Sequence, residues 1–192
     1  MKKLLIFFFL GFAMTSNAQK FQLGAKGGVN ISNYTGDDIE SNALVGFHLG
    51  AFINFMFGDN LSLQPEVLFS TQGTKFEDAG DEQDWKVNYL NIPVMLKYRF
   101  NRGFFVEAGP QIGLKLSEDL GGETSEDLIK NSDVSAAVGL GFHGKSGLGI
   151  GARYNMGLSK IADFEFEGVK PDVKNSVIQL SIFYTLFNNR DR

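Results

Sequence analysis

Two neighbouring stretches of the chain alternate apolar and polar or mixed positions without interruption, and this alternation most constrains the fold. Every second residue from Leu90 to Phe100 is apolar, and the same holds from Phe104 to Leu116. A period of two residues is typical of β-strands that have one buried face. The three residues between the stretches, 101–103, end in glycine and suit a tight hairpin turn. The sequence therefore predicts a β-hairpin over residues 89–116.

The same pattern recurs along the rest of the chain and predicts eight strands. They are expected at 20–31, 43–57, 61–74, 86–100, 104–117, 133–143, 147–160 and 175–187. Three connections are short (58–60, 101–103 and 144–146), and four are longer and polar (32–42, 75–85, 118–132 and 161–174). An even set of antiparallel strands with short turns at one end and long loops at the other predicts an all-β fold, an eight-stranded antiparallel up-and-down β-barrel.

Residues 1–18 are predicted to be a secretory signal peptide. Lys2 and Lys3 precede an apolar run of about a dozen residues, and Ser16 and Ala18 stand at the positions that a signal peptidase reads. The alternative, a retained anchor helix, is disfavoured because the run is too short to span a bilayer. Residues 19–192 are then expected to form one outer-membrane β-barrel domain. The chain has no cysteine, so neither lipoprotein acylation nor a disulfide framework is available.

The two faces of the predicted strands differ sharply. One face is apolar and carries no charged residue. The other face carries the charged and histidine residues Lys26, His48, Glu66, Lys97, Arg99, Glu107, Lys115 and Arg153, and nearly all strand glycines. Gly27 is the one strand glycine on the apolar face.

The distribution of glycine decides which face points outward. In a soluble barrel the glycine-rich face would meet water, where strand glycines weaken the sheet and pack against nothing. An eight-stranded barrel has an interior only wide enough for side chains to fill, so small residues are needed there. We therefore expect the apolar face to meet lipid, which makes this a transmembrane β-barrel.

A family resemblance agrees with this interpretation. The segments LQPEVLFSTQGTKF (63–76), YLNIPVMLKYRF (89–100) and FFVEAGPQIG (104–113) resemble the PorT-like porin family of small outer-membrane β-barrel proteins. The resemblance covers the mature chain and implies residence in the outer membrane of a Gram-negative envelope. It also implies that some relatives assist protein secretion. The chain departs from the family in ending on LFNNRDR rather than on a terminal aromatic residue.

The charged residues of the inner face are expected to form an interior ion-pair network. Its members are Lys26, Glu66, Lys97, Arg99, Glu107 and Arg153. A three-residue turn at 101–103 places Lys97 directly opposite Glu107, and ring closure brings Arg153 across the lumen toward Glu66. The same closure is expected to pack Phe52 across the lumen against Gly139 and Gly151, with these two glycines paired around a turn at 144–146.

Prolines at 65, 93 and 110 interrupt the predicted strands. Each removes a backbone donor from a barrel that has no edges, so we expect bulges or locally opened pairing at these positions.

No catalytic, cofactor or metal site is predicted. His48 and Ser70 are expected to lie opposite each other on neighbouring strands, but a polar interior filling explains the pair better than a nucleophilic site does. The acidic segments 77–84 and 117–127 could bind Ca²⁺ weakly, although neither has the spacing of a calcium loop and solvated loops are the favoured interpretation. The net charge of −4 and the acidic loops argue against nucleic-acid binding.

The function expected from the sequence is that of an integral outer-membrane barrel with a closed interior and periplasmic termini. Its role would be structural, surface-interacting or secretion-accessory, with outer-membrane lipid around it and an envelope protein partner at the acidic loops or the barrel wall. The alternative is a small-solute channel. The bulky and charged residues that point inward oppose that alternative.

Overall fold

The computed structural model describes residues 20–35, 42–78, 81–100, 103–119, 130–159 and 174–189. The predicted signal peptide, the turn residues 101–102 and most of the long connections lie outside these ranges. No α-helix long and apolar enough to span a bilayer occurs in the described residues.

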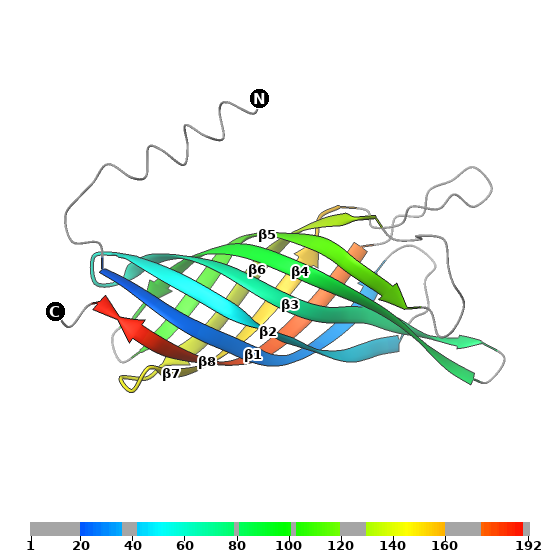
Figure 1. Cartoon of the computed structure of the whole chain (residues 1–192), viewed down its shortest axis with the longest axis horizontal. Helices are drawn as coiled ribbons and strands as arrows, with labels where there is room; N and C mark the ends of the chain where they lie inside the picture. Colours follow the sequence, from blue (N-terminus) through cyan, green and yellow to red (C-terminus); the bar gives the residue numbers. More distant parts are fainter. Residues whose placement is uncertain are drawn as a thin grey trace, which may run out of the picture.

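Eight antiparallel strands close into a barrel in which each strand pairs with its sequence neighbours and β1 pairs with β8 (Figure 1). The predicted fold class is confirmed. The strands are β1 (Lys20–Thr35), β2 (Asn42–Phe57), β3 (Leu61–Asp78), β4 (Asp81–Arg99), β5 (Phe104–Asp119), β6 (Ser132–His143), β7 (Leu148–Gly157) and β8 (Lys174–Asn188). The start of β1 and the end of β8 lie at the end of the barrel that carries the short turns (Figure 1).

The strand ends differ from prediction most clearly at the β3–β4 connection. The expected loop at 75–85 is instead a continuation of both strands, which stay in register as far as the pair Asp78 and Asp81. This β3–β4 arm projects beyond the rest of the barrel (Figure 1). A ladder needs only backbone hydrogen bonds to continue, so the loss of apolar alternation marked the edge of the membrane band and not the end of the strands.

The turn between β6 and β7 lies one residue later than predicted. Gly144 N donates to Leu148 O at 2.8 Å, so the turn is Lys145–Gly147, and Gly147 has a φ of +87°. Gly103, with a φ of +95°, occupies the same last position in the turn before β5. The predicted pairing of Gly139 with Gly151 is therefore wrong, because Gly139 pairs with Arg153 and Gly141 with Gly151. The registers predicted around 58–60 and 101–103 are confirmed.

Each strand proline opens the ladder on one side and keeps it on the other. Pro65 pairs with Val94 of β4, but the ladder with β2 is interrupted between the pairs Phe52–Glu66 and Phe55–Leu63. The ladders beside Pro93 and Pro110 are interrupted in the same one-sided way, with no change of register. The expected local opening is thus observed at the prolines. Register shifts occur elsewhere, between Leu23 and Gly24, between Ala43 and His48, and between Asn88 and Tyr89.

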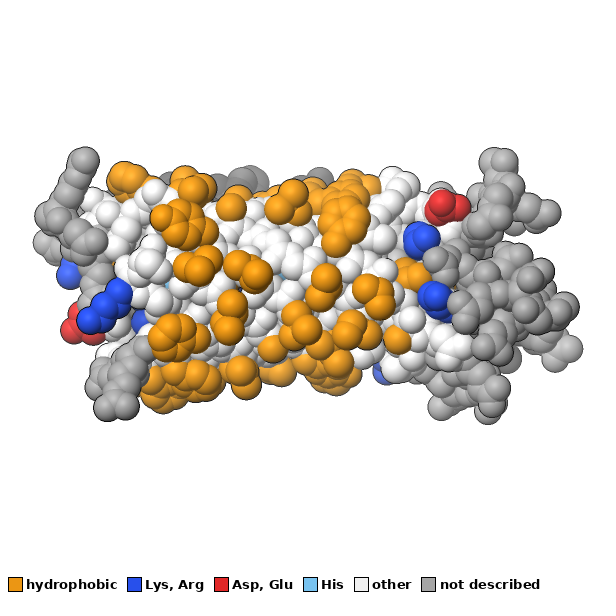
Figure 2. Space-filling view, turned by 90° about the horizontal axis from the view of Figure 1, so that it is seen from below, with side chains coloured by type: hydrophobic (Ala, Val, Ile, Leu, Met, Phe, Trp, Pro, Cys, Tyr) orange, Lys and Arg blue, Asp and Glu red, His pale blue; other side chains and the backbone are white. Residues whose placement is uncertain are grey.

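The apolar face points outward along the described strands, as predicted. Ile182 on the outer face is 63% exposed, whereas the next residue, Phe183, is 6% exposed inside the barrel. Figure 2 shows apolar side chains spread over the middle of the barrel wall, with charged side chains toward its two ends. A wall of this kind suits a bilayer, whose apolar band on such barrels is about 25 Å tall.

Glycines make room for three interior phenylalanines, but from the side and not across the lumen. Phe52, Phe105 and Phe183 pair in the ladder with glycines of the neighbouring strand, namely Gly24, Gly141 and Gly149. A Cβ at these glycines would lie 2.3, 2.6 and 2.2 Å from the Cζ atom of the respective ring. The predicted packing of Phe52 against Gly139 and Gly151 is therefore wrong. Aromatic rings laid over a strand glycine are a known way of supporting it.

Candidate functional site

The centre of the lumen holds a cluster of five charged side chains from five strands. Lys26 comes from β1, Glu66 from β3, Lys97 from β4, Glu107 from β5 and Arg153 from β7. Inward-facing positions of antiparallel strands recur every second residue, so closure of the ring brings these side chains together from far apart in the sequence. We refer to these five residues as the lumen cluster.

Arg153 joins the two carboxylates of the lumen cluster. Its Nη2 lies 2.7 Å from Oε1 of Glu66 and 2.7 Å from Oε1 of Glu107. Its Nη1 donates to Oε2 of Glu66 at 3.1 Å, and its Nε donates to Oε1 of Glu107 at 2.9 Å. The guanidinium thus uses its planar array of donors to hold two strands on different sides of the lumen.

The two lysines complete the lumen cluster. Lys26 Nζ lies 3.2 Å from Oε2 of Glu66, and Lys97 Nζ lies 3.4 Å from Oε2 of Glu107, its partner across the β4–β5 ladder. Gln64 links the two halves, because it accepts from Lys97 Nζ at 2.9 Å and donates to Oε1 of Glu66 at 2.8 Å. Charged groups removed from water need this degree of mutual pairing.

A layer of aromatic rings lies against the lumen cluster. Lys97 Nζ stands 4.1 Å from the centroid of the Phe105 ring and 5.4 Å from that of Phe183. The ring centroid of Phe183 is in turn 6.0 Å from those of Phe52 and Phe105. The side chains of both layers are buried. Buried rings and ion pairs thus lie at adjacent heights in the lumen, where the width of an eight-stranded barrel leaves room for little more than side chains.

Arg99, the sixth residue expected in the network, lies apart from the lumen cluster. Its Nη2 is 2.7 Å from Nδ1 of His143. Arginine can only donate, so this imidazole is neutral with its proton on Nε2, which donates to Thr185 Oγ1 at 3.1 Å. The ring of His143 also packs edge-on against the ring of Phe183, with 5.2 Å between the ring centroids. Arg99 and His143 therefore lie on the short-turn side of the aromatic layer.

His48 belongs to a separate network of neutral polar side chains. It pairs with Ser70 in the β2–β3 ladder, as predicted. Its hydrogen bonds, however, go to Asn30 Oδ1 at 2.8 Å and to Ser181 Oγ at 2.9 Å. Sequence reasoning missed Ser181, although the alternation in β8 places it on the inner face.

The serine, histidine and asparagine of this network have the connectivity of a nucleophilic triad. Ser181 is 6% exposed, His48 1% and Asn30 0%. The Ser181 hydroxyl points to the lumen side of the wall, where it lies 2.9 Å from Nε2 of His48. The arrangement accounts for the hydrogen-bonding capacity of three interior side chains, a role that buried polar groups require in any case.

The β3–β4 arm is the second feature that stands out, and its register brings acidic residues opposite each other. Glu77 pairs with Glu82 and Asp78 with Asp81 in the ladder. Like charges at directly opposed positions destabilise a sheet. The suggested Ca²⁺ segments 77–84 and 117–127 lie largely outside the described side chains. Within the described residues there is no group of three or more side chains suited to hold a metal ion.

A closed eight-stranded barrel with an apolar outer face and a buried cluster of charged side chains in the lumen defines an outer-membrane β-barrel protein. The model of the outer membrane protein β-barrel domain family matches residues 17–163, and the chain belongs to this family. No curated protein matches the chain.

Several solved structures are similar to this chain at low sequence identity, and the first of them has the same fold. Neisserial surface protein A is 14% identical with a TM-score of 0.56, and the match covers 85% of this chain and 97% of that one. OprG from Pseudomonas aeruginosa is 11% identical with a TM-score of 0.49, over 86% of this chain and 96% of that one. Ail from Yersinia pestis, solved with a heparin analogue, is 21% identical with a TM-score of 0.48, over 86% and 98% of the two chains.

Proposed function

We propose that this outer-membrane protein is a closed, non-enzymatic barrel that acts as a surface-interaction or secretion-accessory protein of the PorT-like type. The observation that carries the proposal is the lumen, where the lumen cluster and the three phenylalanines occupy the interior at adjacent heights. With the interior filled, solutes have no path, and the surfaces available for a function are the arm, the loops and the outer wall.

The proposed orientation places both termini and the three short turns in the periplasm and the β3–β4 arm outside the cell. Short periplasmic turns and longer extracellular connections are typical of bacterial outer-membrane barrels. The observed asymmetry between the two ends supports this orientation. Protease added to intact cells should cut the arm and leave an epitope at the C-terminus untouched, and the reverse pattern would refute it.

The arm is the proposed contact for a basic envelope or extracellular protein. Its register pairs acidic residues of β3 with acidic residues of β4, and like charges at opposed ladder positions are unfavourable unless a positively charged partner surface compensates them. Such an interaction should weaken as salt is raised, because exposed charges are screened within about 8 Å at physiological ionic strength.

Cross-linking in intact cells tests this proposal. The wild-type protein is compared with an arm variant that lacks the opposed charges. The arm variant carries Glu77→Gln, Asp78→Asn, Asp81→Asn and Glu82→Gln. Asp59→Asn, in the turn at the other end of the barrel, is the matched control. The proposal expects one cross-linked partner that is lost in the arm variant and kept in the control. A partner retained by the arm variant would refute the role of the arm.

The alternative function is a small-solute channel. It requires a continuous aqueous path along the lumen, and the filled cross-section argues against one. Planar-bilayer conductance separates the two functions.

A further inference from the structure

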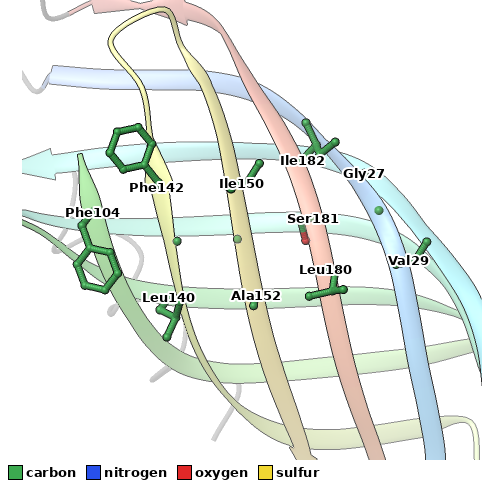
Figure 3. Close-up of a pocket in the computed structure, with 13 residues that line it drawn as sticks. Gly27, Val29, Phe104, Leu140, Phe142, Ile150, Ala152, Leu180, Ser181 and Ile182 are labelled. Carbon is green, nitrogen blue, oxygen red and sulfur yellow. The ribbon is translucent and has the colours of Figure 1, made fainter. Parts of the chain in front are cut away.

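A groove in the lipid-facing wall runs across β8, β7 and β6, between β1 and β5. Its cavity volume is about 840 Å³. The ladder pairs align its walls: Phe142, Ile150 and Ile182 form one row of outward side chains, and Leu140, Ala152 and Leu180 form the next row. Figure 3 shows the two rows one above the other along the strands, with Ser181 between them.

Two small residues stand in the outward rows that border this groove. Gly27 continues the first row on β1, as the partner of Ile182, and Ala152 stands in the second row. Between the rows lie Gly141, Gly151, Ser181 and Gly28, whose side chains, where present, face the lumen. Gly27 is the glycine that sequence analysis found on the apolar face, and the groove accounts for its position there.

The polarity of the groove changes from its centre to its short-turn end. Along its length its outward side chains are apolar, and the one polar side chain of its floor, Ser181, uses its hydroxyl inside the barrel with His48. Phe142 also lines a second cavity, of about 1010 Å³, at the mouth of the barrel, whose charged lining residues are Asp59, Arg99 and Lys145, two cations and one carboxylate. An occupant that is apolar over its length and polar or anionic at one end matches both parts.

We propose that the groove binds one acyl chain of a glycerophospholipid whose anionic headgroup lies at the Lys145–Gly147 turn. An acyl chain is favoured over a protein segment because the groove offers its occupant no hydrogen bond, whereas protein contacts within a membrane rely on such bonds or on close backbone packing. The driving force is van der Waals contact in the groove together with the Lys145 charge, since lipid tails are as apolar as the wall. The proposed orientation of the barrel places the bound phospholipid in the periplasmic leaflet of the outer membrane. The binding itself does not depend on that orientation.

The test is native mass spectrometry of the protein released from nanodiscs of phosphatidylglycerol and phosphatidylethanolamine. The wild type should retain one phospholipid. The variant Gly27→Leu with Ala152→Leu should lower the retained fraction by roughly tenfold, because leucine side chains take the space in which the chain makes its contacts. A Cβ at Gly27 would meet Leu49 Cδ1 at 3.2 Å, a side chain that can shift, so the variant should fold. Ala108→Leu, on the outer face away from the groove, is the matched control.

The variant Lys145→Gln tests the contribution of the headgroup to binding independently of the contribution of the acyl chain. It should reduce retention of phosphatidylglycerol more than that of phosphatidylethanolamine. Equal retention by the wild type and the filled-groove variant, or equal loss in the Ala108→Leu control, would overturn the proposal. A dimer mass that disappears in the filled-groove variant would also overturn it, because the groove would then bind a second copy of the chain. None of these outcomes bears on the cross-linking of the arm.

Discussion

Arg153 Nη2 lies 2.7 Å from Glu66 Oε1, and this contact joins β7 to β3 across the lumen. The same nitrogen lies 2.7 Å from Glu107 Oε1 on β5. One guanidinium therefore pairs with both carboxylates of the lumen cluster, and Lys26 and Lys97 are their second partners. Loss of the Arg153 side chain should therefore weaken the contacts between β3, β5 and β7.

The first prediction concerns Arg153. Arg153→Met should destabilise the barrel by about 3–5 kcal/mol, because it leaves two buried carboxylates short of their main partner. The variant that removes all five charges of the lumen cluster, by adding Lys26→Met, Glu66→Gln, Lys97→Met and Glu107→Gln, should recover much of this loss, because it leaves no buried charge without a partner. The free energy of unfolding of each variant is measured by urea unfolding in lipid vesicles. The folded and unfolded fractions are read from their separate bands on gels. A charge-free variant less stable than Arg153→Met would show that the cluster is not an electrostatic unit.

The second prediction tests the outward face. Val138 is 55% exposed on the middle of the wall, and Val138→Arg should cost about 2–4 kcal/mol at the bilayer midplane. Ser132→Arg, at the loop end of the same strand, should cost about 0–1 kcal/mol. The folded fraction of each variant in vesicles gives the comparison. Equal tolerance of the two arginines would mean that β6 does not face lipid.

The third prediction compares two inward glycines of β7. A Cβ at Gly149 would lie 2.2 Å from the Phe183 ring, so Gly149→Ala should cost about 1–3 kcal/mol. A Cβ at Gly151 would have its nearest contacts at 3.5 and 3.7 Å, so Gly151→Ala should be close to neutral. Unfolding midpoints in detergent distinguish the two. A costly Gly151→Ala would indicate tighter packing beside Phe105 than the structure has.

The fourth prediction concerns the arm. Replacing Glu77, Asp78, Asp81 and Glu82 by their amides should stabilise the hairpin, because each like-charged pair costs about 0.2–1 kcal/mol. Hydrogen exchange at the arm amides should slow, while exchange in the membrane band stays unchanged. Faster exchange in the arm would show that the acidic side chains support the hairpin.

The sequence predicted those features that depend on whether a residue stands at an odd or an even position in its strand. Alternation assigns each side chain to the lumen or to lipid, and a three-residue turn preserves that assignment, so Lys97 opposite Glu107 could be derived before the fold was seen. The inward position of Phe183 follows from the same rule.

Alternation could not predict the exact position of a turn, the packing partners of a side chain in the lumen, or the point at which a strand ends. The turn at Lys145–Gly147 contains a glycine at its end as well as just before its start, so its position was ambiguous by one residue. The side-by-side packing of Phe52 on Gly24 depends on the stagger of the strands, which alternation does not encode. The arm extends beyond the membrane band, where a strand no longer needs an apolar face.

Planar-bilayer conductance tests the closed lumen most directly. Purified protein, with a known porin inserted under the same conditions as a positive control, is added to a bilayer and the current is recorded. The lumen cluster and the aromatic layer predict no steady conductance steps after insertion. Steady steps that scale with salt concentration and disappear when the protein is left out would contradict a closed barrel.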